Sequence, residues 1–215
     1  MINFLLKNPN LYRFYQKTVR AKYDEYDFFK FIFKKKKLKN IRMLDICCGD
    51  SYILEYVSEF IEDYLGVDNN DSYLNKCRKR WKKFNFIKLD LDLDKDECID
   101  HFVKFKPNFI FINGAIHHLN DKIVKSISSF VTTKFPESYF LSVDGVKDDN
   151  TLLNSLLIKI DRGKYIRSKS HYAELLNFFE TFIIDDFYKF NYKQIFHYRN
   201  FNLEEFYYQW KNENK

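Results

Sequence analysis

The segment that decides the fold is Met43-Leu44-Asp45-Ile46-Cys47-Cys48-Gly49-Asp50-Ser51, written MLDICCGDS at residues 43–51. Its first half is an apolar run typical of a buried strand, and its second half predicts a tight turn at Gly49 and a helix beginning near Ser51. A helix N-terminus beside a closely approaching backbone suits a carboxylate or a phosphate. Nineteen residues after Gly49, Asp68 closes the next apolar run, where a carboxylate can accept both hydroxyl hydrogens of a ribose. We therefore expect a nucleoside site between Gly49 and Asp68.

The same alternation of strand and helix continues along the chain. Short apolar runs end near polar residues, and stretches with helical spacing separate them, which predicts a parallel sheet with helices on both faces. The polar ends are 22 or 23 residues apart, so we expect them along one cleft at the carboxyl edge of the sheet; chance spacing is the alternative. The expected strands, with these end residues, are 41–47 (Asp45), 64–68 (Asp68), 86–90 (Asp90), 109–113 (Asn113) and 139–144.

The two flanks of this core predict an N-terminal helix and a C-terminal hairpin. Apolar residues recur every three to four positions from Leu11 to Phe33, which predicts a long helix ending in the Lys34–Lys37 run. This helix is expected either to form a lid that brings Tyr15 to a substrate or to belong to the core or to a homodimer contact. Helices are also expected over 152–160 and 172–179, and aromatic strands over 182–191 and 194–201.

The composition indicates a packed globular protein. Aromatic residues make up 20% and charged residues 31% of the 215 residues, which is incompatible with a disordered chain. The five glycines are about 2% of the chain, against about 7% on average, which excludes fully glycine-lined phosphate loops. No apolar run approaches the roughly 20 residues of a bilayer span, and the N-terminus does not resemble a signal peptide. We expect a cytoplasmic protein that does not insert into membranes and whose four cysteines are reduced.

Charge patterns predict no metal site. The net charge of +6 comes largely from Lys34–Lys37 and Arg78–Lys83. Such clusters are typical of solvated helix ends, and attraction of an anionic substrate, nucleic acid or a membrane surface is the alternative. The acidic run from Asp90 to Glu97 lacks the glycine and glutamate that a calcium loop needs at its sixth and twelfth positions.

Four short motifs in this order resemble those of class I S-adenosylmethionine-dependent methyltransferases. LDICCGDS at 44–51 is similar to the first motif, an acidic residue followed by a G-x-G-x-G loop that touches the methionine part of the cofactor. GVDNN at 66–70 resembles the ribose-binding motif, KLDLD at 88–92 the adenine-binding motif, and INGAIHHLND at 112–121 the fourth motif. The resemblance covers about residues 41–144. It implies an α/β, Rossmann-like fold with a mostly parallel seven-stranded sheet and a C-terminal antiparallel hairpin.

The resemblance also implies S-adenosylmethionine as cofactor. Only Gly49 of the three loop glycines is present, because Cys47 and Ser51 replace the other two. Both replacements are small, and Ser51 can cap the following helix, so we expect cofactor binding to survive. A decayed fold that serves as a non-catalytic partner subunit is the alternative. The implied cofactor-binding residues are Asp45, Ile46, Cys47, Gly49, Asp68, Asn69, Asp90, Leu91, Asn113 and Gly114.

Two flanking segments, at 8–22 and 161–172, resemble a bacterial branch that methylates small molecules and is often encoded with sugar-modifying enzymes. In the second segment, Arg162, Lys164 and Arg167 favour an anionic acceptor such as a phosphorylated or nucleotide-linked sugar; a solvated loop is the alternative. The Asn/Asp-Pro-Pro-aromatic motif of base-methylating enzymes is absent after Asn113, which disfavours a nucleic-acid substrate.

His117 is the candidate general base for a hydroxyl acceptor. Methyl transfer needs a nucleophile in line behind the methyl group at about 3–3.5 Å, and a hydroxyl must also lose its proton. His117 follows the fourth strand at the mouth of the expected cleft, and an imidazole titrates near neutral pH. A structural role is the alternative, and His171 is a second candidate.

We expect one methyltransferase domain over 1–215, with a helical lid at 1–38, a cofactor core at 39–145, and substrate-side helices and terminal strands at 146–215. The expected reaction is methylation of an oxygen on a small, sugar-containing or anionic acceptor. RNA or tRNA methylation is the alternative.

Overall fold

One seven-stranded sheet organises the chain, which the computed structural model describes over residues 24–91, 96–147, 163–188 and 192–214. The strand order is β3-β2-β1-β4-β5-β7-β6, and every neighbouring pair is parallel except that β7 runs antiparallel to β5 and β6. This confirms the predicted mostly parallel sheet with a C-terminal antiparallel hairpin. The strands are β1 (Ile41–Ile46), β2 (Ile61–Asp68), β3 (Asn85–Lys88), β4 (Phe109–Asn113), β5 (Tyr139–Gly145), β6 (Glu180–Ile184) and β7 (Gln194–Arg199).

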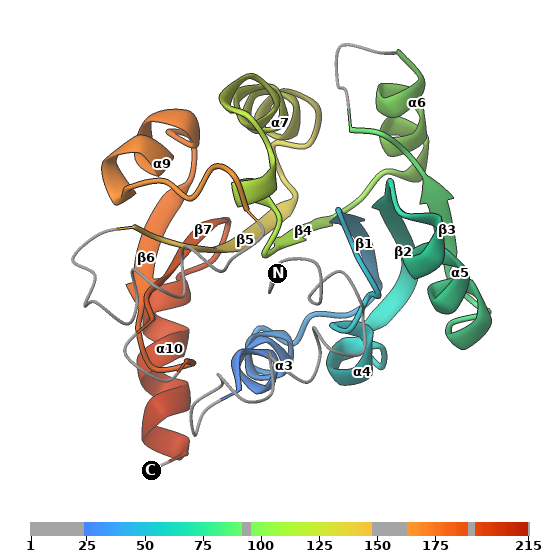
Figure 1. Ribbon diagram of the computed structural model, residues 1–215. Coiled ribbons are helices and arrows are strands. Elements are labelled where there is room, and N and C mark those ends of the chain that lie inside the picture. Colours follow the sequence, from blue (N-terminus) through green and yellow to red (C-terminus); the bar gives the residue numbers. More distant parts are fainter. Residues whose placement is uncertain (1–23, 92–95, 148–162, 189–191, 215) are drawn as a thin grey trace, which may run out of the picture.

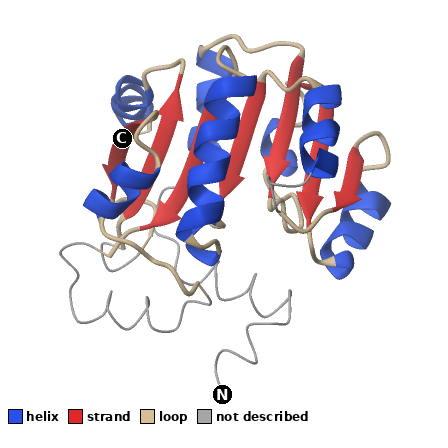
Figure 2. Ribbon diagram, turned by 90° about the horizontal axis from the view of Figure 1, so that it is seen from above, coloured by secondary structure: helices blue, strands red, loops and turns tan. Residues whose placement is uncertain are grey.

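Helices cover both faces of the sheet (Figures 1 and 2). One face carries α3 (Glu25–Lys35), α4 (Leu54–Val57), α5 (Asp71–Arg80) and α10 (Leu203–Glu213). The other carries α6 (Asp96–Phe105), α7 (Asp121–Lys134) and α9 (Lys169–Leu175), while the short helix η1 (Ile116–His118) follows β4. Among the described helices, none combines the length and the apolar character needed to cross a membrane.

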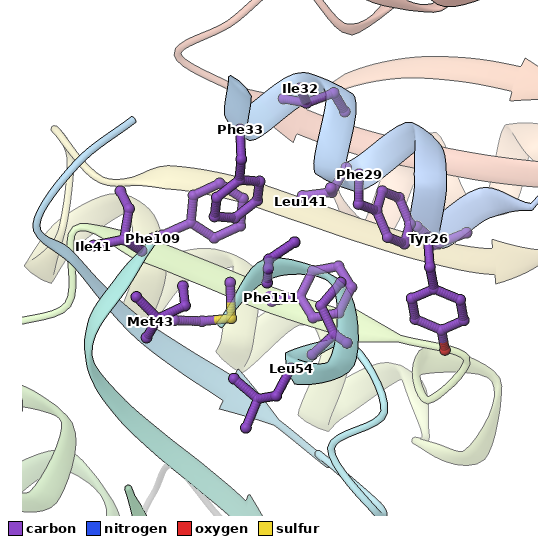
Figure 3. Packing of buried hydrophobic residues seen from close by; sticks show 14 of the residues in the cluster. Tyr26, Phe29, Ile32, Phe33, Ile41, Met43, Leu54, Phe109, Phe111 and Leu141 are labelled. Atoms are coloured by element: carbon purple, nitrogen blue, oxygen red, sulfur yellow. The ribbon is translucent and has the colours of Figure 1, made fainter. Parts of the chain in front are cut away.

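Alternation along the central strands divides the core into two layers. Phe109 and Phe111 of β4 point toward α3, where Phe33 and Phe29 meet them at ring-centroid distances of 4.9 and 5.5 Å (Figure 3). The intervening Ile110 packs in the layer on the opposite face. Because successive side chains of a strand point to opposite faces, this unbroken apolar run fills both layers at once.

The N-terminal helix differs from the prediction. A continuous helix from Leu11 is wrong, because Asp24 has an extended backbone and its side chain accepts a hydrogen bond of 2.9 Å from the Tyr26 amide, which starts α3. The predicted lysine-rich end is confirmed by Lys34 and Lys35 in the last turn. Tyr15 lies outside the described residues.

The C-terminal region also departs from the prediction. A helix, α10, follows the hairpin, although only terminal strands were expected. Its buried Leu203, Tyr207 and Trp210 stand at the three-to-four-residue spacing of a helix. The first hairpin strand is displaced, because β6 covers 180–184 instead of 182–191. The helix expected over 152–160 lies outside the described residues.

Candidate functional site

The turn after β1 has the backbone of a glycine loop with two other residues in it. Cys47, Gly49 and Ser51 have φ angles of 58°, 53° and 52°, all in the left-handed region. That region costs an L-residue roughly 1–2 kcal/mol and a glycine almost nothing. These are the three positions of the G-x-G-x-G pattern that the sequence resembles, and Cys47 and Ser51 adopt left-handed backbone there at the cost of strain.

Hydrogen bonds hold the turn (residues 47–51) to the end of β2. The Gly49 amide donates to Asp68 Oδ2 at 2.9 Å, and the Cys48 amide donates to the Val67 carbonyl at 2.9 Å. The second oxygen of Asp68 accepts from the Asn70 amide at 2.8 Å. Asp68 thus joins the loop after β1 to the loop after β2, which are the two segments that the sequence predicted to face one nucleoside.

Ser51 does not cap a helix, so that expectation is wrong. Helix α4 begins at Leu54, and its N-cap position is Ile53, which makes no side-chain cap hydrogen bond. Ser51 is buried, and its Oγ is hydrogen-bonded to the Tyr64 hydroxyl oxygen at 3.0 Å. A serine at this position supplies a hydroxyl partner for Tyr64, which a glycine would not.

Asp45 lies beneath the turn. It is only 3% exposed, and its Oδ2 accepts a hydrogen bond from the hydroxyl of the fully buried Tyr64. Burial is the main reason that the pKa of Asp45 rises to about 7; the Tyr64 hydrogen bond opposes this rise, and the charges of Asp68 and Asp50 add to it. Asp45 is therefore connected to Ser51 of the turn through the Tyr64 hydroxyl, and its carboxyl group changes charge near pH 7.

A second pair of loops meets at the carboxyl ends of β4 and β5. Asp144 is 1% exposed, and its two oxygens accept from the Ile116 amide at 2.9 Å and the His117 amide at 3.3 Å. Asp144 Oδ1 also contacts His117 Nδ1. An ionised carboxylate only accepts hydrogen bonds, so Nδ1 carries the proton in this pair, and in the neutral imidazole the lone pair is then on Nε2.

The segment after β5 covers His117. A Cβ atom on Gly163 would lie 1.8 Å from His117 Cδ2, so only glycine allows the backbone to approach the imidazole this closely. The Tyr165 amide donates to the His117 carbonyl at 2.9 Å. His117 is accordingly 7% exposed and held from two sides. His118 is exposed beside it, with ring centroids 4.2 Å apart.

Tyr26 connects the N-terminal helix to this site, and the sequence interpretation missed it. The Asn113 amide group donates to the Tyr26 hydroxyl at 3.0 Å, which ties the start of α3 to the end of β4. The Tyr26 ring lies 5.0 Å from that of Tyr52, directly after the turn, and 5.2 Å from that of Tyr56 in α4. Its helical spacing marked Tyr26 as a core residue, and no local signal indicated a polar partner.

Arg167 has contacts that occupy its guanidinium. It is 4% exposed, pairs with Asp121 Oδ1 at 2.7 Å, and donates to the Leu119 carbonyl at 2.6 Å and the Ile116 carbonyl at 3.2 Å. Arg167 thus fastens the segment after β5 to the loop after β4, and its expected contact with a substrate stays a prediction. Arg162 lies outside the described residues.

The remaining candidate residues lie along the same edge of the sheet. Ile46 is buried in β1, Leu91 is buried just after β3, and Asn69 and Asp90 are exposed at the ends of β2 and β3. Gly114 resembles Gly49, because it has a φ of 61° and a Cβ there would meet nothing within 4 Å. His171 Nε2 lies 3.1 Å from Asp121 Oδ2. Within the described ranges, no three His, Cys, Asp or Glu side chains gather to hold a metal ion.

Comparison with known proteins shows the fold. No protein-family model matches the sequence, and no functionally characterised sequence matches it significantly. Solved structures do match. The methyltransferase domain of bacterial CtHen1 is 12% identical with a TM-score of 0.55, covering 81% of this chain and 97% of that one. This chain has the class I methyltransferase fold.

Two further structures with this fold were solved with small molecules bound. One is DhpI with SAM and HEP, at 15% identity and a TM-score of 0.53 over 78% of this chain and 83% of that one. The other is human N-acetylserotonin methyltransferase with SAM, at 14% identity and a TM-score of 0.52 over 74% of this chain and 47% of that one. This chain thus spans about half the length of the human enzyme.

Replacing Asp45 with Asn should remove a pH dependence of stability. The folded-state pKa of Asp45, about 7, exceeds its ordinary value of 3.8, so the folded state holds the extra proton between those values. The stabilisation of the folded state by protonated Asp45 is fully present below pH 3.8 and is lost as pH rises through 7. We expect the free energy of unfolding, measured in urea, to fall by at least about 1 kcal/mol more from about pH 4.5 to about pH 8 in the wild type than in D45N.

The exposed Asp100 of α6 provides the matched control. D100N should retain the pH dependence of the wild type, because that side chain lies in solvent. If D45N and D100N show the same slope of stability against pH, the assigned protonation of Asp45 is wrong.

Proposed function

We propose that this chain is an S-adenosylmethionine-dependent methyltransferase that methylates an oxygen of a small, sugar-containing or anionic acceptor. The proposed use of S-adenosylmethionine rests on the left-handed turn after β1, which is hydrogen-bonded through Gly49 to Asp68 at the end of β2. The presence of SAM in structures with the same fold supports it.

The residues at the sheet edge fit this cofactor. Gly49 and Gly114 follow the neighbouring strands β1 and β4, both have left-handed φ angles, and a Cβ on either would enter open space. A ligand can therefore approach the backbone closely at both points. Asp68 presents a half-buried carboxylate for ribose hydroxyls, and Leu91 offers an apolar surface after β3 for a base.

The proposed methylation of an acceptor oxygen depends on His117 and Asp144. The cofactor, when bound, supplies a methyl group activated by a positively charged sulfur. A hydroxyl acceptor must lose its proton as it attacks, and His117 Nε2 is the atom that takes it. Asp144 fixes the tautomer through Nδ1 and stabilises the imidazolium that forms, while the cover of Gly163 restricts water.

Two alternatives remain from the sequence. Strain at Cys47 and Ser51 favours a non-catalytic partner subunit, which would not bind the cofactor. RNA or tRNA methylation has less support, because two arginines of the basic cluster are engaged: Arg78 donates to the Phe86 carbonyl at 2.9 Å, and Arg80 pairs with Glu55 at 2.6 Å.

Calorimetric titration with S-adenosylmethionine tests the cofactor site. Asp68→Ala removes the acceptor for ribose hydroxyls and for the Gly49 amide, so affinity should fall at least tenfold, about 1.4 kcal/mol. Asp71→Ala, three residues further along at the exposed start of α5, should bind like the wild type. Absence of wild-type binding would favour the partner-subunit alternative, and equal binding by D68A would refute the assignment of Asp68.

The pH dependence of methyl transfer tests the base. With a hydroxyl acceptor found by screening with methyl-labelled cofactor, kcat should rise with pH to a plateau. His117→Gln should lower kcat about 10²–10⁴-fold and abolish that rise. Asp144→Asn should lower kcat and move the apparent pKa of the rise downward, because the carboxylate no longer stabilises the imidazolium.

NMR supplies a readout that is independent of the acceptor. Nitrogen-15 spectra should show His117 protonated at Nδ1 in the wild type. A His117→Gln profile identical in shape to that of the wild type would exclude His117 as the base, and so would a neutral imidazole that is protonated on Nε2.

A further inference from the structure

Arg167 lies beside the turn that carries His117, and its buried guanidinium is fully hydrogen-bonded within the protein. A guanidinium has five N–H groups, and Arg167 makes five hydrogen bonds of 2.6–3.2 Å. Two of them go to Asp121 Oδ1, and the others go to the carbonyls of Ile116, Leu119 and Tyr165. A ligand could bind this guanidinium only by displacing one of these acceptors.

Arg167 and Asp144 hold opposite sides of the peptide groups in η1. A helix of three residues leaves peptide amides unpaired at its start and carbonyls unpaired at its end. The Asp144 carboxylate accepts from the amides of Ile116 and His117. Arg167 donates to the carbonyl of Ile116 at 3.2 Å and to that of Leu119 at 2.6 Å. The carboxylate and the guanidinium therefore fix the turn together.

The same guanidinium holds the segment that covers His117. Its Nη1 donates to the Tyr165 carbonyl at 2.9 Å as well as to the Ile116 carbonyl. The Tyr165 amide in turn donates to the His117 carbonyl at 2.9 Å. The backbone of Arg167 is itself anchored, because its carbonyl accepts from the Lys147 amide at 3.0 Å, shortly after β5. Arg167 therefore joins β5, the covering segment and the turn after β4.

The orientation of the imidazole depends on this arrangement. His117 Nδ1 contacts Asp144 in β5, and the close approach of Gly163 limits movement of the ring on the other side. The contact with Asp144 is kept only while the turn after β4 stays at its place beside β5. Lysine in place of Arg167 would keep the charge, but three N–H groups on a single nitrogen do not match acceptors arranged around a planar fork.

We propose that Arg167 is a positioning residue for the methyl transfer: it fixes the turn 116–119 and the covering segment, so that His117 keeps Nδ1 on Asp144 and Nε2 as the proton acceptor. The role of His117 in catalysis rests on the proposed function. The hold of Arg167 on the imidazole rests on these hydrogen bonds alone and can be measured without an acceptor.

NMR of the Nδ1 proton of His117 tests this hold. The proton exchanges with water when the turn opens, so the loss of the guanidinium hydrogen bonds in Arg167→Lys should speed its exchange at least about tenfold. The matched control is Arg199→Lys. Arg199 also donates to two backbone carbonyls, but it pairs with β5 at the end opposite Asp144. R199K should exchange this proton like the wild type, even where urea unfolding shows that both variants lose the same stability.

Asp121→Ala is a second and milder variant, for use if R167K does not fold. It removes the carboxylate that takes two of the five hydrogen bonds, and the Asp121 side chain is 48% exposed, so the fold should persist. The Nδ1 proton should exchange faster than in the wild type, because the guanidinium can then turn away from the carbonyls.

A double-mutant cycle on kcat separates positioning from a merely structural role. With the acceptor used for the pH profile, R167K should lower kcat about tenfold to 10²-fold, as a displaced base would, and leave the affinity for S-adenosylmethionine unchanged. In a chain that carries His117→Gln, R167K should lower kcat no further, because the base through which Arg167 acts is gone.

The proposal is overturned if R167K or D121A exchanges the Nδ1 proton like the wild type, or if R199K speeds exchange as much as R167K. It is also overturned if R167K lowers kcat by the same factor with and without His117. Faster exchange in R167K together with a wild-type activity that does not need His117 would refute the proposed base while confirming that Arg167 holds the imidazole, so the two failures are distinguishable.

Discussion

The hydrogen bond from the Gly49 amide to Asp68 Oδ2, 2.9 Å long, is the constraint on which the candidate site depends. It holds the chain after β1 against the end of β2, and Gly49 has a left-handed backbone where it is made. Cys47 and Ser51 adopt the same left-handed conformation on either side. The strain at these two residues, roughly 1–2 kcal/mol each, is offset by the contacts of the turn with β2 and by the buried Ser51.

Buried carboxylates fix the loops at both halves of the sheet edge. Asp45 and Asp144 are 3% and 1% exposed, and each is stabilised by donors from a neighbouring loop or strand. Removing a carboxylate from water costs several kcal/mol unless donors surround it, so each loop must keep the position that satisfies its carboxylate. This is why Tyr64 and the η1 turn are held in place, and why His117 has one defined orientation.

Much of the fold could be predicted from the sequence, because strongly apolar runs and their polar ends are local signals. All five predicted core strands are present within three residues of the expected limits. The long N-terminal helix failed at Asp24, where a side-chain cap outweighed the apolar period. Helix α10 was not predicted, because its aromatic residues suit strands as well as helices.

The candidate site was predictable only in part. Motif spacing indicated Gly49, Asp68 and His117, and the topology places them at one edge of the sheet. The contacts of Tyr26 and Asp144 join residues 87 and 27 positions apart, and no local pattern encodes such contacts. Charge alone suggested that Arg167 binds a substrate, but its partners are backbone carbonyls and Asp121, which only the fold brings together.

The central claim is that the left-handed turn after β1 binds S-adenosylmethionine through the open backbone at Gly49. Calorimetric affinities of Gly49→Ala and Cys47→Gly test it most directly. G49A places a methyl group where the ligand approaches and adds strain, so affinity should fall at least tenfold, about 1.4 kcal/mol. C47G relieves strain and should bind at least as tightly as the wild type. Equal affinity of G49A and the wild type, or a loss of binding in C47G alone, would contradict this claim.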